Sequence, residues 1–402
     1  MKDMRRYRSG AMLLTLLAAL AIIAFGARGA PAEETGVTND AIKIGIFAPF
    51  TGSVANWGYP IARWAMAVYE DANTKGGIHG RKLVMVEEDD QCDPSKGVAA
   101  VKKLIHSHKV FMLHGANCSN AALAVRPEVQ QTKVPWLVMG ATNINVYLPT
   151  DPYIFGVMMT SDMEGALLAD FAMTVPNAKR IAVVTHRDAW GLGKYEPVIN
   201  RLKERYQATP VADETMDRGA NDSAPQTLRL KAANPDAVIV ILYPKEGAVF
   251  LRDALKYGLG PVFVGNGALE DIPDLVSKTG TDAAVKTLYS LTQLRYPLDG
   301  SEFAPLVAKL KARYPGTAIS SFLPVAYAGA EAVVEALRRS GRDLTREKFV
   351  KELERIRGFE STMLAGSLDF SPADHRGSRS ANFVVYKDGK LAILGQKYAP
   401  IR

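Results

Sequence analysis

The alternation of short apolar runs with helical patterns is the feature that most constrains the fold of this 402-residue chain. The run at residues 42–49 predicts a buried β-strand. Apolar residues spaced three and four apart from Ile61 to Ala72 predict a helix that starts just after Pro60 and ends at Lys75. Further strands are expected at residues 83–86, 110–113, 134–139, 181–185, 238–242 and 262–265, and helices at 94–106, 120–131, 162–174, 194–206, 223–233 and 247–257. This order predicts a doubly wound α/β fold with parallel sheets.

Beyond about residue 288 the pattern changes to longer helices, expected at 302–313, 325–339 and 346–356. Near the end, two apolar runs at 383–387 and 391–394 flank Asp388-Gly389, a dipeptide typical of a β-hairpin. A chain of this length exceeds what one hydrophobic core usually serves, so two lobes are expected. Because no flexible linker separates them, the chain should cross between the lobes several times.

The first 32 residues have the pattern of a secretory signal peptide. Basic residues from Lys2 to Arg8 precede an uncharged apolar run at 11–25, and small residues follow as far as Ala32. A permanent anchor is the alternative, but fifteen residues at ~1.5 Å each span only ~22 Å of a ~30 Å hydrocarbon core. The mature protein is therefore expected in the periplasm, without stable membrane insertion after cleavage.

The charge of the mature chain gives no support for nucleic-acid binding. Removal of residues 1–32 takes away five positive charges and one negative charge, so the formal charge falls from +7 to about +3. The remaining Lys and Arg residues stand next to Asp and Glu along helical segments, as on solvated faces.

Only two cysteines occur, Cys92 and Cys118. Because disulfides persist in exported proteins, a bridge between them is expected, with two buried free thiols as the alternative. Such a bridge would stabilise the fold by roughly 3 to 4 kcal/mol in the chain-entropy model.

Small and hydroxyl-bearing residues follow two neighbouring predicted strands. Asn117 and Ser119 come after one strand, and Gly140, Ala141 and Thr142 come after the next. Ligands of open parallel sheets bind beyond the carboxyl ends of the strands, where backbone N–H groups and helix amino ends attract anions. The two loops are therefore predicted to converge on one carboxylate, with simple helix capping as the alternative.

Three aromatic residues also fall in predicted strand-end loops: Trp57, Trp190 and Tyr243. Aromatic residues outside helical stripes are harder to explain as core. We expect them to pack against the apolar body of a ligand.

Several motifs occur in the order found in one known family. They are Ile42-Lys43-Ile44-Gly45, Phe50-Thr51-Gly52, residues 73–81 with Lys75-Gly76-Gly77-Ile78, residues 89–94 with Cys92, and Gly115-Ala116-Asn117-Cys118-Ser119. Over nearly all of the mature chain the sequence resembles the leucine/isoleucine/valine-binding proteins of bacterial branched-chain amino-acid ABC importers.

The resemblance implies a type I periplasmic binding fold, with two lobes, a three-crossover hinge and a ligand in the cleft. We expect residues 33–160 and 290–375 in the N-terminal lobe, and 161–289 and 376–402 in the C-terminal lobe. The implied function is that of a monomeric solute-binding protein, without a cofactor, that hands a small carboxylate to an inner-membrane permease.

The resemblance also assigns individual positions. It implies a disulfide between Cys92 and Cys118 and a carboxylate-binding role for Ser119. The contacts of the next loop fall on Gly140, Ala141 and Thr142, and the aromatic cleft residues fall on Trp57, Trp190 and Tyr243.

The sequence departs from the family at the amine end of the ligand. Amino-acid binders of this family place a Glu after the predicted strand at 262–265, but this chain has Asn266-Gly267 there and Glu270 three residues later. An unpaired buried ammonium costs several kcal/mol. Either Asn266 and Glu270 complete an amino-acid site, for a hydrophobic or branched-chain amino acid, or the ligand is an amine-free aromatic or aliphatic carboxylate. Asn117, where the family often has an apolar residue, adds to the second possibility.

Other classes of function have less support. The sequence lacks the Gly-rich dinucleotide and phosphate motifs and the Gly-x-Ser-x-Gly motif, so an enzyme is not expected. The acidic run at 87–90 lacks the spacing of a calcium loop, and His106 with His108 has no further ligand nearby, so no metal is expected. A ligand-sensing ectodomain without a transport role stays as a second alternative.

Overall fold

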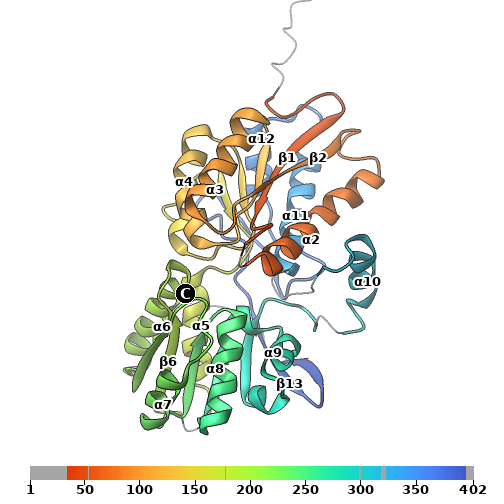
Figure 1. The fold of residues 1–402 in the computed structure, drawn as a ribbon. Helices are drawn as coiled ribbons and strands as arrows, with labels where there is room; N and C mark the ends of the chain where they lie inside the picture. The colour runs from red at the N-terminus through yellow and green to blue at the C-terminus, as the bar shows by residue number, and fades with distance from the viewer. Residues whose placement is uncertain (1–33, 53, 177, 298–299, 318–322, 395–402) are drawn as a thin grey trace, which may run out of the picture.

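The computed structural model describes residues 34–394 except 53, 177, 298–299 and 318–322, and Figure 1 shows two α/β lobes, one above the other. The predicted signal peptide lies outside the described residues. Within the described range, no helix combines the length and the apolar character needed to cross a bilayer.

Five parallel strands form the first sheet, in the order β2-β1-β3-β4-β5. In the central strand β1, Ile44 pairs with Met85 on one side and with Met112 on the other. Ile44 and Ile46 enter one hydrophobic cluster and Phe47 enters another, because successive side chains point to opposite faces. The strands are β1 (Ala41–Ala48), β2 (Lys82–Asp89), β3 (Met112–Gly115), β4 (Trp136–Val138) and β5 (Ile154–Gly156).

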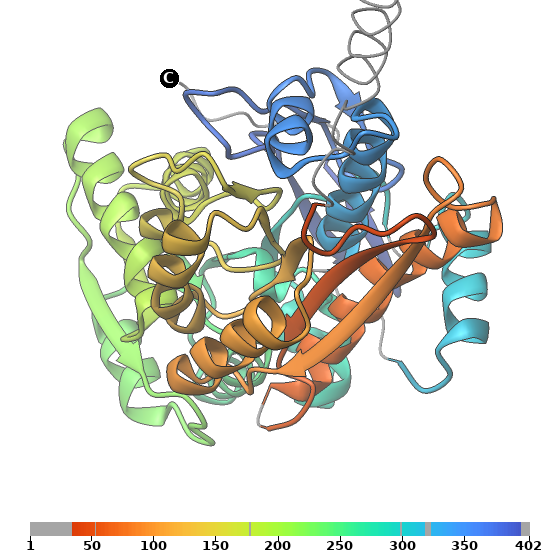
Figure 2. The same ribbon diagram turned by 90° about the horizontal axis from the view of Figure 1, so that it is seen from above.

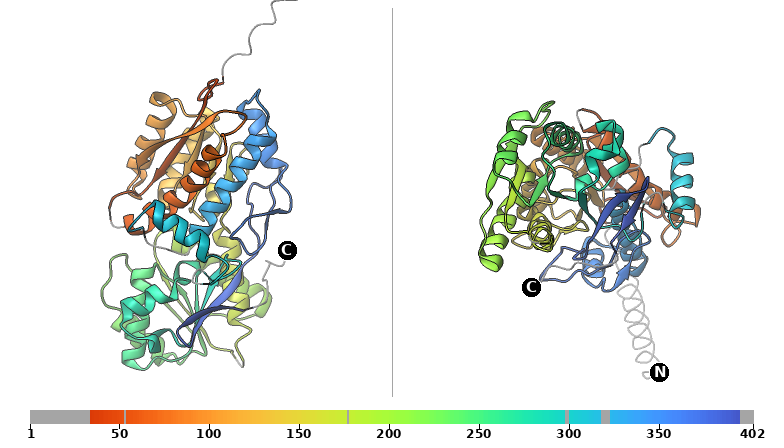
Figure 3. Two further views of the ribbon diagram at one scale, coloured as in Figure 1. Left: turned by 90° about the vertical axis from the view of Figure 1, so that its right-hand side faces the viewer. Right: turned by 90° about the horizontal axis from the view of Figure 1, so that it is seen from below.

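Helices cover both faces of this sheet, which makes the first lobe (Figures 2 and 3). On one face α2 (Ala55–Thr74) packs against α11 (Leu323–Arg339), which also contacts α12 (Arg346–Glu354). On the other face α3 (Pro94–Lys102), continued by the π-helix η1 (Lys103–Ser107), packs against α4 (Ser119–Thr132). A short 3-10 turn, η2 (Ile144–Val146), follows β4. Helix α10 (Ala304–Arg313) lies beside α2, where Lys309 and Arg313 pair with Asp71.

The second sheet has the strand order β14-β13-β10-β9-β8-β6-β7. The strands β6 to β10 are parallel, whereas β13 and β14 form an antiparallel hairpin at one edge. Asp388 and Gly389 at its turn both have positive φ, which confirms the predicted hairpin. The strands are β6 (Ile181–His186), β7 (Ala212–Met216), β8 (Ala237–Ile241), β9 (Val262–Gly265), β10 (Leu288–Thr292), β13 (Asn382–Lys387) and β14 (Lys390–Ile393).

Helices again cover both faces of the second sheet and complete the second lobe. On one face α5 (Ser161–Ala172) packs along α6 (Ala189–Tyr206). On the other face α8 (Pro244–Tyr257) packs between α7 (Ala224–Ala232) and α9 (Ile272–Thr279). Two 3-10 turns, η3 (Gly267–Leu269) and η4 (Asp282–Val285), follow β9 and α9.

The chain passes between the two sheets three times: between β5 and α5, between β10 and α10, and before β13. Ahead of the last crossing, β11 (Phe359–Glu360) and β12 (Ser367–Leu368) form a small antiparallel pair. Bridges between Gly156 and Arg376 and between Leu294 and Leu364 join the crossing segments to one another. The predicted two-lobed α/β fold with a three-crossover hinge is confirmed.

Two predicted helix starts are wrong. Helix α2 begins at Ala55, six residues earlier than expected, and Pro60 lies inside it. A proline there removes only one helical hydrogen bond, and the buried apolar face of α2 offsets the loss. Helix α6 begins at Ala189 rather than at residue 194, because the Asp188 side chain accepts a hydrogen bond from Gly191 N at 2.8 Å and caps the helix.

Five strands were not expected: β5, β7 and β10 of the two large sheets, and β11 and β12 of the small antiparallel pair. β5 has only three residues, and β7 is an edge strand with only one buried residue, so neither carries a clear apolar pattern. β10 falls at the point where the sequence pattern changes. Their pairing partners, rather than local pattern, make them strands.

Candidate functional site

The carboxyl ends of β3 and β4 form the first wall of the candidate site. After β3, Ala116 has a left-handed backbone conformation with φ of +66°, and its carbonyl accepts hydrogen bonds from Gly140 N and Ala141 N at 3.0 and 3.2 Å. The two predicted loops are therefore joined to each other. Because these two N–H groups are used within the protein, the donors available to an anion come from side-chain hydroxyls and from the start of α4.

Ser119 is the first residue of α4 and is buried. Its Oγ accepts a hydrogen bond from Asn143 N at 3.3 Å, which leaves its own O–H to donate elsewhere. Among the described residues, no side chain caps the first turn of α4. The amino end of this helix, with its partial positive charge, therefore lies beside the Ser119 hydroxyl, an arrangement that suits a carboxylate.

Asn117, just before α4, is also buried. Its Nδ2 lies 3.5 Å from Gly58 O, and within the described part of the chain its Oδ1 has no hydrogen-bond partner. A buried amide oxygen of this kind can accept a hydrogen bond from a ligand O–H or N–H.

A disulfide bond joins Cys92 to Cys118, with their Cα atoms 5.4 Å apart, so the predicted bridge is confirmed. Cys118 is the residue immediately before α4, and Cys92 lies in the loop after β2. The bridge therefore anchors the start of the helix that carries Ser119.

An aromatic pair forms the second wall, from the other lobe. Trp190 lies in the first turn of α6 and Tyr243 immediately precedes α8. Their rings stack with centroids 4.2 Å apart and an interplanar angle of 16°. The structure thus brings together two of the three predicted aromatic residues. The backbone of the third, Trp57, belongs to the first turn of α2, and its side chain lies outside the described part of the chain.

His186, at the end of β6, fixes the backbone beneath this pair. Its Nε2 accepts a hydrogen bond from Tyr243 N at 3.1 Å, so its Nδ1 is the atom that donates to Met216 O at 2.8 Å. Burial lowers the pKa of His186, which is consistent with the neutral ring that these bonds require. Burial also raises the pKa of the Tyr243 hydroxyl, so it stays protonated.

A buried lysine that the sequence analysis missed lies next to the aromatic pair. Lys194 is one turn after Trp190 on α6 and is 1% exposed. Its Nζ donates to Thr142 Oγ1 at 2.9 Å and lies 4.0 Å from the centroid of the Trp190 ring. Burial lowers the pKa of Lys194, and the neighbouring Glu164 opposes this by raising it. The spacing of four residues from Trp190 on one helix face was the one available signal for Lys194.

Glu164, on α5, completes this network. Its Oε2 lies 3.4 Å from Lys194 Nζ, and its Oε1 accepts a hydrogen bond from Gly267 N at 2.8 Å. Ser161 on the same helix donates to Thr142 Oγ1 at 2.9 Å. The hydroxyl of Thr142 thus receives two hydrogen bonds, one from Lys194 on α6 and one from Ser161 at the start of α5.

The two polar residues predicted after β9 have different surroundings. Asn266 is buried, and the surrounding donors and acceptors assign its amide with the nitrogen towards Leu242 O and Val240 O and the oxygen towards Ala268 N, at 3.0 to 3.2 Å. Its side chain therefore binds the local backbone. Glu270 lines a small cavity of about 10 Å³, close to the volume one water needs. The cavity is also lined by Met158, Met159, Glu164, Gly267, Leu291, Gln293 and Val325.

The two walls contact each other directly. Asn143 Nδ2 donates to Ala189 O at 2.7 Å, and Arg218 lies 3.7 Å from Cys92 Sγ. A Cβ atom at Gly193 would lie 3.0 Å from Asn143 Nδ2, so a glycine permits this close approach of α6. The structure therefore represents the lobes closed on each other.

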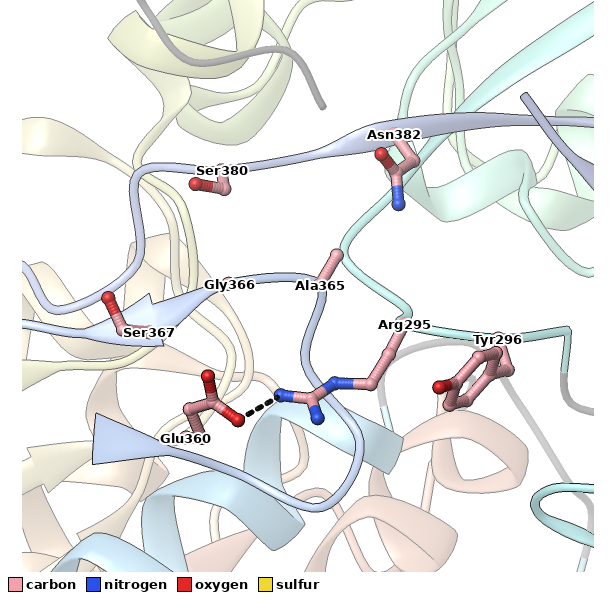
Figure 4. Close-up of a pocket in the computed structure, with 8 residues that line it drawn as sticks. All are labelled: Arg295, Tyr296, Glu360, Ala365, Gly366, Ser367, Ser380 and Asn382. Carbon is pink, nitrogen blue, oxygen red and sulfur yellow. Dashed lines mark ion pairs between the residues drawn. The ribbon is translucent and has the colours of Figure 1, made fainter. Parts of the chain in front are cut away.

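A larger pocket, of about 620 Å³, lies beside the hinge rather than between the two walls. Figure 4 shows Arg295 from the segment after β10 reaching toward Glu360, with a 3.6 Å separation between the charged atoms. None of the residues predicted to bind the ligand lines it; those that do are Arg295, Tyr296, Glu360, Ala365, Gly366, Ser367, Ser380 and Asn382. Over the described residues, no cluster of His, Cys, Asp and Glu has the arrangement of a metal site.

The two walls lie at strand ends of different lobes and close on each other, and three chain crossings join the lobes. This arrangement defines a two-lobed binding protein. The family model of periplasmic binding proteins matches residues 41–390. The chain belongs to this family, and the resemblance noted from its motifs is confirmed.

Known relatives and solved structures are similar to this chain over most of its length. The chain is 28% identical over 314 residues to a leucine-specific-binding protein of Salmonella typhimurium, covering 77% of this chain and 82% of the relative. It is also similar in fold to two solved structures. One is a fatty acid ABC transporter substrate-binding protein from Thermomonospora curvata (TM-score 0.78, 21% identity, 91% and 94% of the two chains). The other is an ABC transporter solute-binding protein from R. palustris in complex with 4-hydroxybenzoate (TM-score 0.76, 20% identity, 90% and 98%).

Proposed function

We propose that this chain is an extracytoplasmic solute-binding protein that binds a small carboxylate between its lobes and delivers it to the permease of an ABC importer. One observation carries the proposal. One wall carries the Ser119 hydroxyl and the start of α4, which no side chain of the described residues caps. The other wall carries the stacked Trp190 and Tyr243. A polar anion site opposite an aromatic surface suits a carboxylate with an apolar body.

In this proposal the first lobe holds the ligand in the open form and the second lobe closes over it. The N-terminal lobe is taken as residues 33–160 and 290–375 and the C-terminal lobe as 161–289 and 376–402, except that β10 stays whole in the C-terminal lobe as far as Thr292. Contacts across the walls, such as Asn143 to Ala189, support a hinge motion that ends in a closed state. Only the closed form would dock productively on the permease, which makes transport depend on the ligand.

The same proposal includes the location and state of the protein. It is exported to the periplasm, loses residues 1–32 and acts there as a monomer without catalytic activity. Mass spectrometry of protein purified from the periplasm tests the export and the cleavage. Its elution volume in size-exclusion chromatography tests the monomeric state.

The carboxylate end is common to two ligand classes. A hydrophobic or branched-chain amino acid agrees with the name of the leucine-specific relative. An amine-free aromatic or aliphatic carboxylate agrees with the names of the fatty acid and 4-hydroxybenzoate proteins. Both classes need the anion site at Ser119.

A thermal-shift screen tests the proposal. The exported protein is mixed with amino acids, with amine-free aliphatic and aromatic acids, and with the uncharged primary amide of each acid. Since a ligand that binds the native state stabilises it by mass action, at least one acid should raise the melting temperature, and its amide should not. If no carboxylate shifts the melting temperature, or if the amides shift it equally, the carboxylate site is wrong.

A further inference from the structure

The cleft contains an ammonium group of its own. Lys194 Nζ lies 2.9 Å from Thr142 Oγ1, 3.4 Å from Glu164 Oε2 and 4.0 Å from the centroid of the Trp190 ring. A hydroxyl, a carboxylate and an aromatic face are the three kinds of group that bind an ammonium well. Lys194 is 1% exposed, so these contacts replace its hydration.

The carboxylate partner of this ammonium lies at the amine end of the candidate site. Glu164 Oε1 accepts the Gly267 N–H at 2.8 Å, and a Cβ atom at Gly267 would lie 3.5 Å from the same oxygen. Gly267 is the position at which an amino-acid binder of this family was expected to carry its acid. In this chain a carboxylate reaches that place from α5, and a lysine from α6 already neutralises it.

The two walls of the site connect through this pair. Ser119 Oγ accepts from Asn143 N, Thr142 is the adjoining residue, and the Thr142 hydroxyl contacts Lys194. A ligand with its carboxylate at Ser119 would therefore have its neighbouring atoms near Lys194. A ligand ammonium there would meet a like charge, or would have to displace Lys194 and leave it buried without a counter-ion. An amine-free carboxylate meets neither obstacle, and its negative charge is attracted by Lys194.

We propose that Lys194, paired with Glu164, is a specificity-determining residue that stands where an amino-acid ligand would place its own ammonium, so that the cleft selects amine-free carboxylates. This inference rests on the proposed function, because it names the ligand class of that same site.

Matched ligand pairs test the proposed role of Lys194 in the wild-type protein. Isothermal titration calorimetry compares leucine with 4-methylpentanoate and phenylalanine with 3-phenylpropanoate, since each pair differs only in the α-amino group. We expect the amine-free member of at least one pair to bind at least about 100-fold more tightly. Equal or tighter binding of the amino acids would overturn the inference and leave the proposed function intact. If neither member of either pair binds, and the wider acid screen is also negative, the proposed function fails and the inference fails with it.

Two variants separate a specificity role from a structural one. Lys194→Met leaves Glu164 without its cation, so the preference should shift towards the amino acid by at least about tenfold. Glu164→Gln keeps an acceptor for Gly267 N but removes the negative charge, so amino-acid binding should stay weak. Lys203→Met, on the exposed face of the same helix, is the matched control and should change neither affinity. An unchanged ligand preference in folded Lys194→Met protein, or a gain of amino-acid binding in Glu164→Gln, would overturn the inference. If the Lys194→Met protein does not fold, the Glu164→Gln variant and the matched ligand pairs in the wild-type protein still test the inference.

Discussion

Asn143 Nδ2 donates a hydrogen bond of 2.7 Å to Ala189 O, which links the loop after β4 in one lobe to the first residue of α6 in the other. The Asn143 Oδ1 accepts from Asn145 N at 3.0 Å, so the amide is held in place to make the contact. The two lobes thus share a hydrogen bond that can exist only when they are closed.

Replacing Asn143 by Ala should shift the population towards the open form. Loss of one such bond costs about 1 kcal/mol, so the ligand should bind about five- to tenfold more weakly. Small-angle scattering of the unliganded variant should give a larger radius of gyration, and calorimetry should give the weaker affinity. Asn145→Ala, an exposed neighbour in the same turn, is the control. Equal scattering curves and equal affinities for Asn143→Ala and wild type would show that this bond does not hold the lobes together.

Replacing Ser119 by Ala should weaken carboxylate binding by one to two orders of magnitude, because a hydrogen bond to a charged group contributes ~1.5 to 3 kcal/mol. Calorimetry with the best acid from the screen measures the loss. Ser95→Ala makes the same change in the first turn of the neighbouring helix α3, on an exposed residue, and should leave the affinity unchanged. An affinity of Ser119→Ala within twofold of wild type contradicts the assignment of the anion site.

Reduction of the Cys92–Cys118 bridge should lower the free energy of unfolding. The cysteines are 26 positions apart, for which the chain-entropy model gives roughly 3 to 4 kcal/mol. Urea unfolding with and without reductant measures the difference. The double variant Cys92→Ser, Cys118→Ser should have the stability of reduced wild type both with and without reductant, because it has no bridge to lose. If reductant lowers the midpoint of the double variant as much as that of wild type, the effect does not come from this bridge.

Asp90 should make the stability of the protein fall as the pH rises from about 4 to 7. Burial raises the pKa of its carboxyl to about 6, and one oxygen accepts from Cys92 N at 2.8 Å. Because the folded pKa lies above the usual ~4, the native state binds more protons than the unfolded state between these two values. The contribution of this group is therefore present at low pH and is lost as the pH rises through 6, by up to about 2 to 3 kcal/mol.

Asp90→Asn tests this, because an amide keeps an acceptor for Cys92 N and cannot ionise. The difference in unfolding free energy between variant and wild type, measured in urea at pH 4.5 and pH 7.5, should favour the variant more at the higher pH. Asp93→Asn, which makes the same change in the same loop, is the control, and the loss of its capping charge at α3 should lower stability somewhat. A difference that does not change with pH would contradict the raised pKa of Asp90.

The fold was largely predictable because its signals are local. The apolar runs of β1 and β8 and the stripe of α2 depend on residues within one element, and their alternation leaves few arrangements other than parallel sheets. The errors arose where the local signal was weak. Gly191 and Gly193 hid the start of α6, and the exposed edge strand β7 has no apolar pattern.

The candidate site was predictable only in part. Ser119 and Thr142 follow strands, and parallel strands present their carboxyl ends at one edge, so chain order alone predicted that their loops would meet. Trp190 and Tyr243 were expected in the cleft, but their stacking depends on β6 and β8 being neighbours in the sheet, which brings the starts of α6 and α8 together.

The sequence by itself therefore determined the alternating α/β order, the two lobes, the cysteine pair and the meeting of the two loops at which a carboxylate is proposed to bind. Only the tertiary structure placed Lys194 beside Glu164 and Glu164 beside Gly267. These residues stand on α5, on α6 and after β9, and each is an ordinary residue in its own segment. The packing of α5 along α6 removes both charges from water, and in that low-dielectric setting a lysine and a glutamate must pair. That pairing depends on which helices touch, which local sequence does not encode.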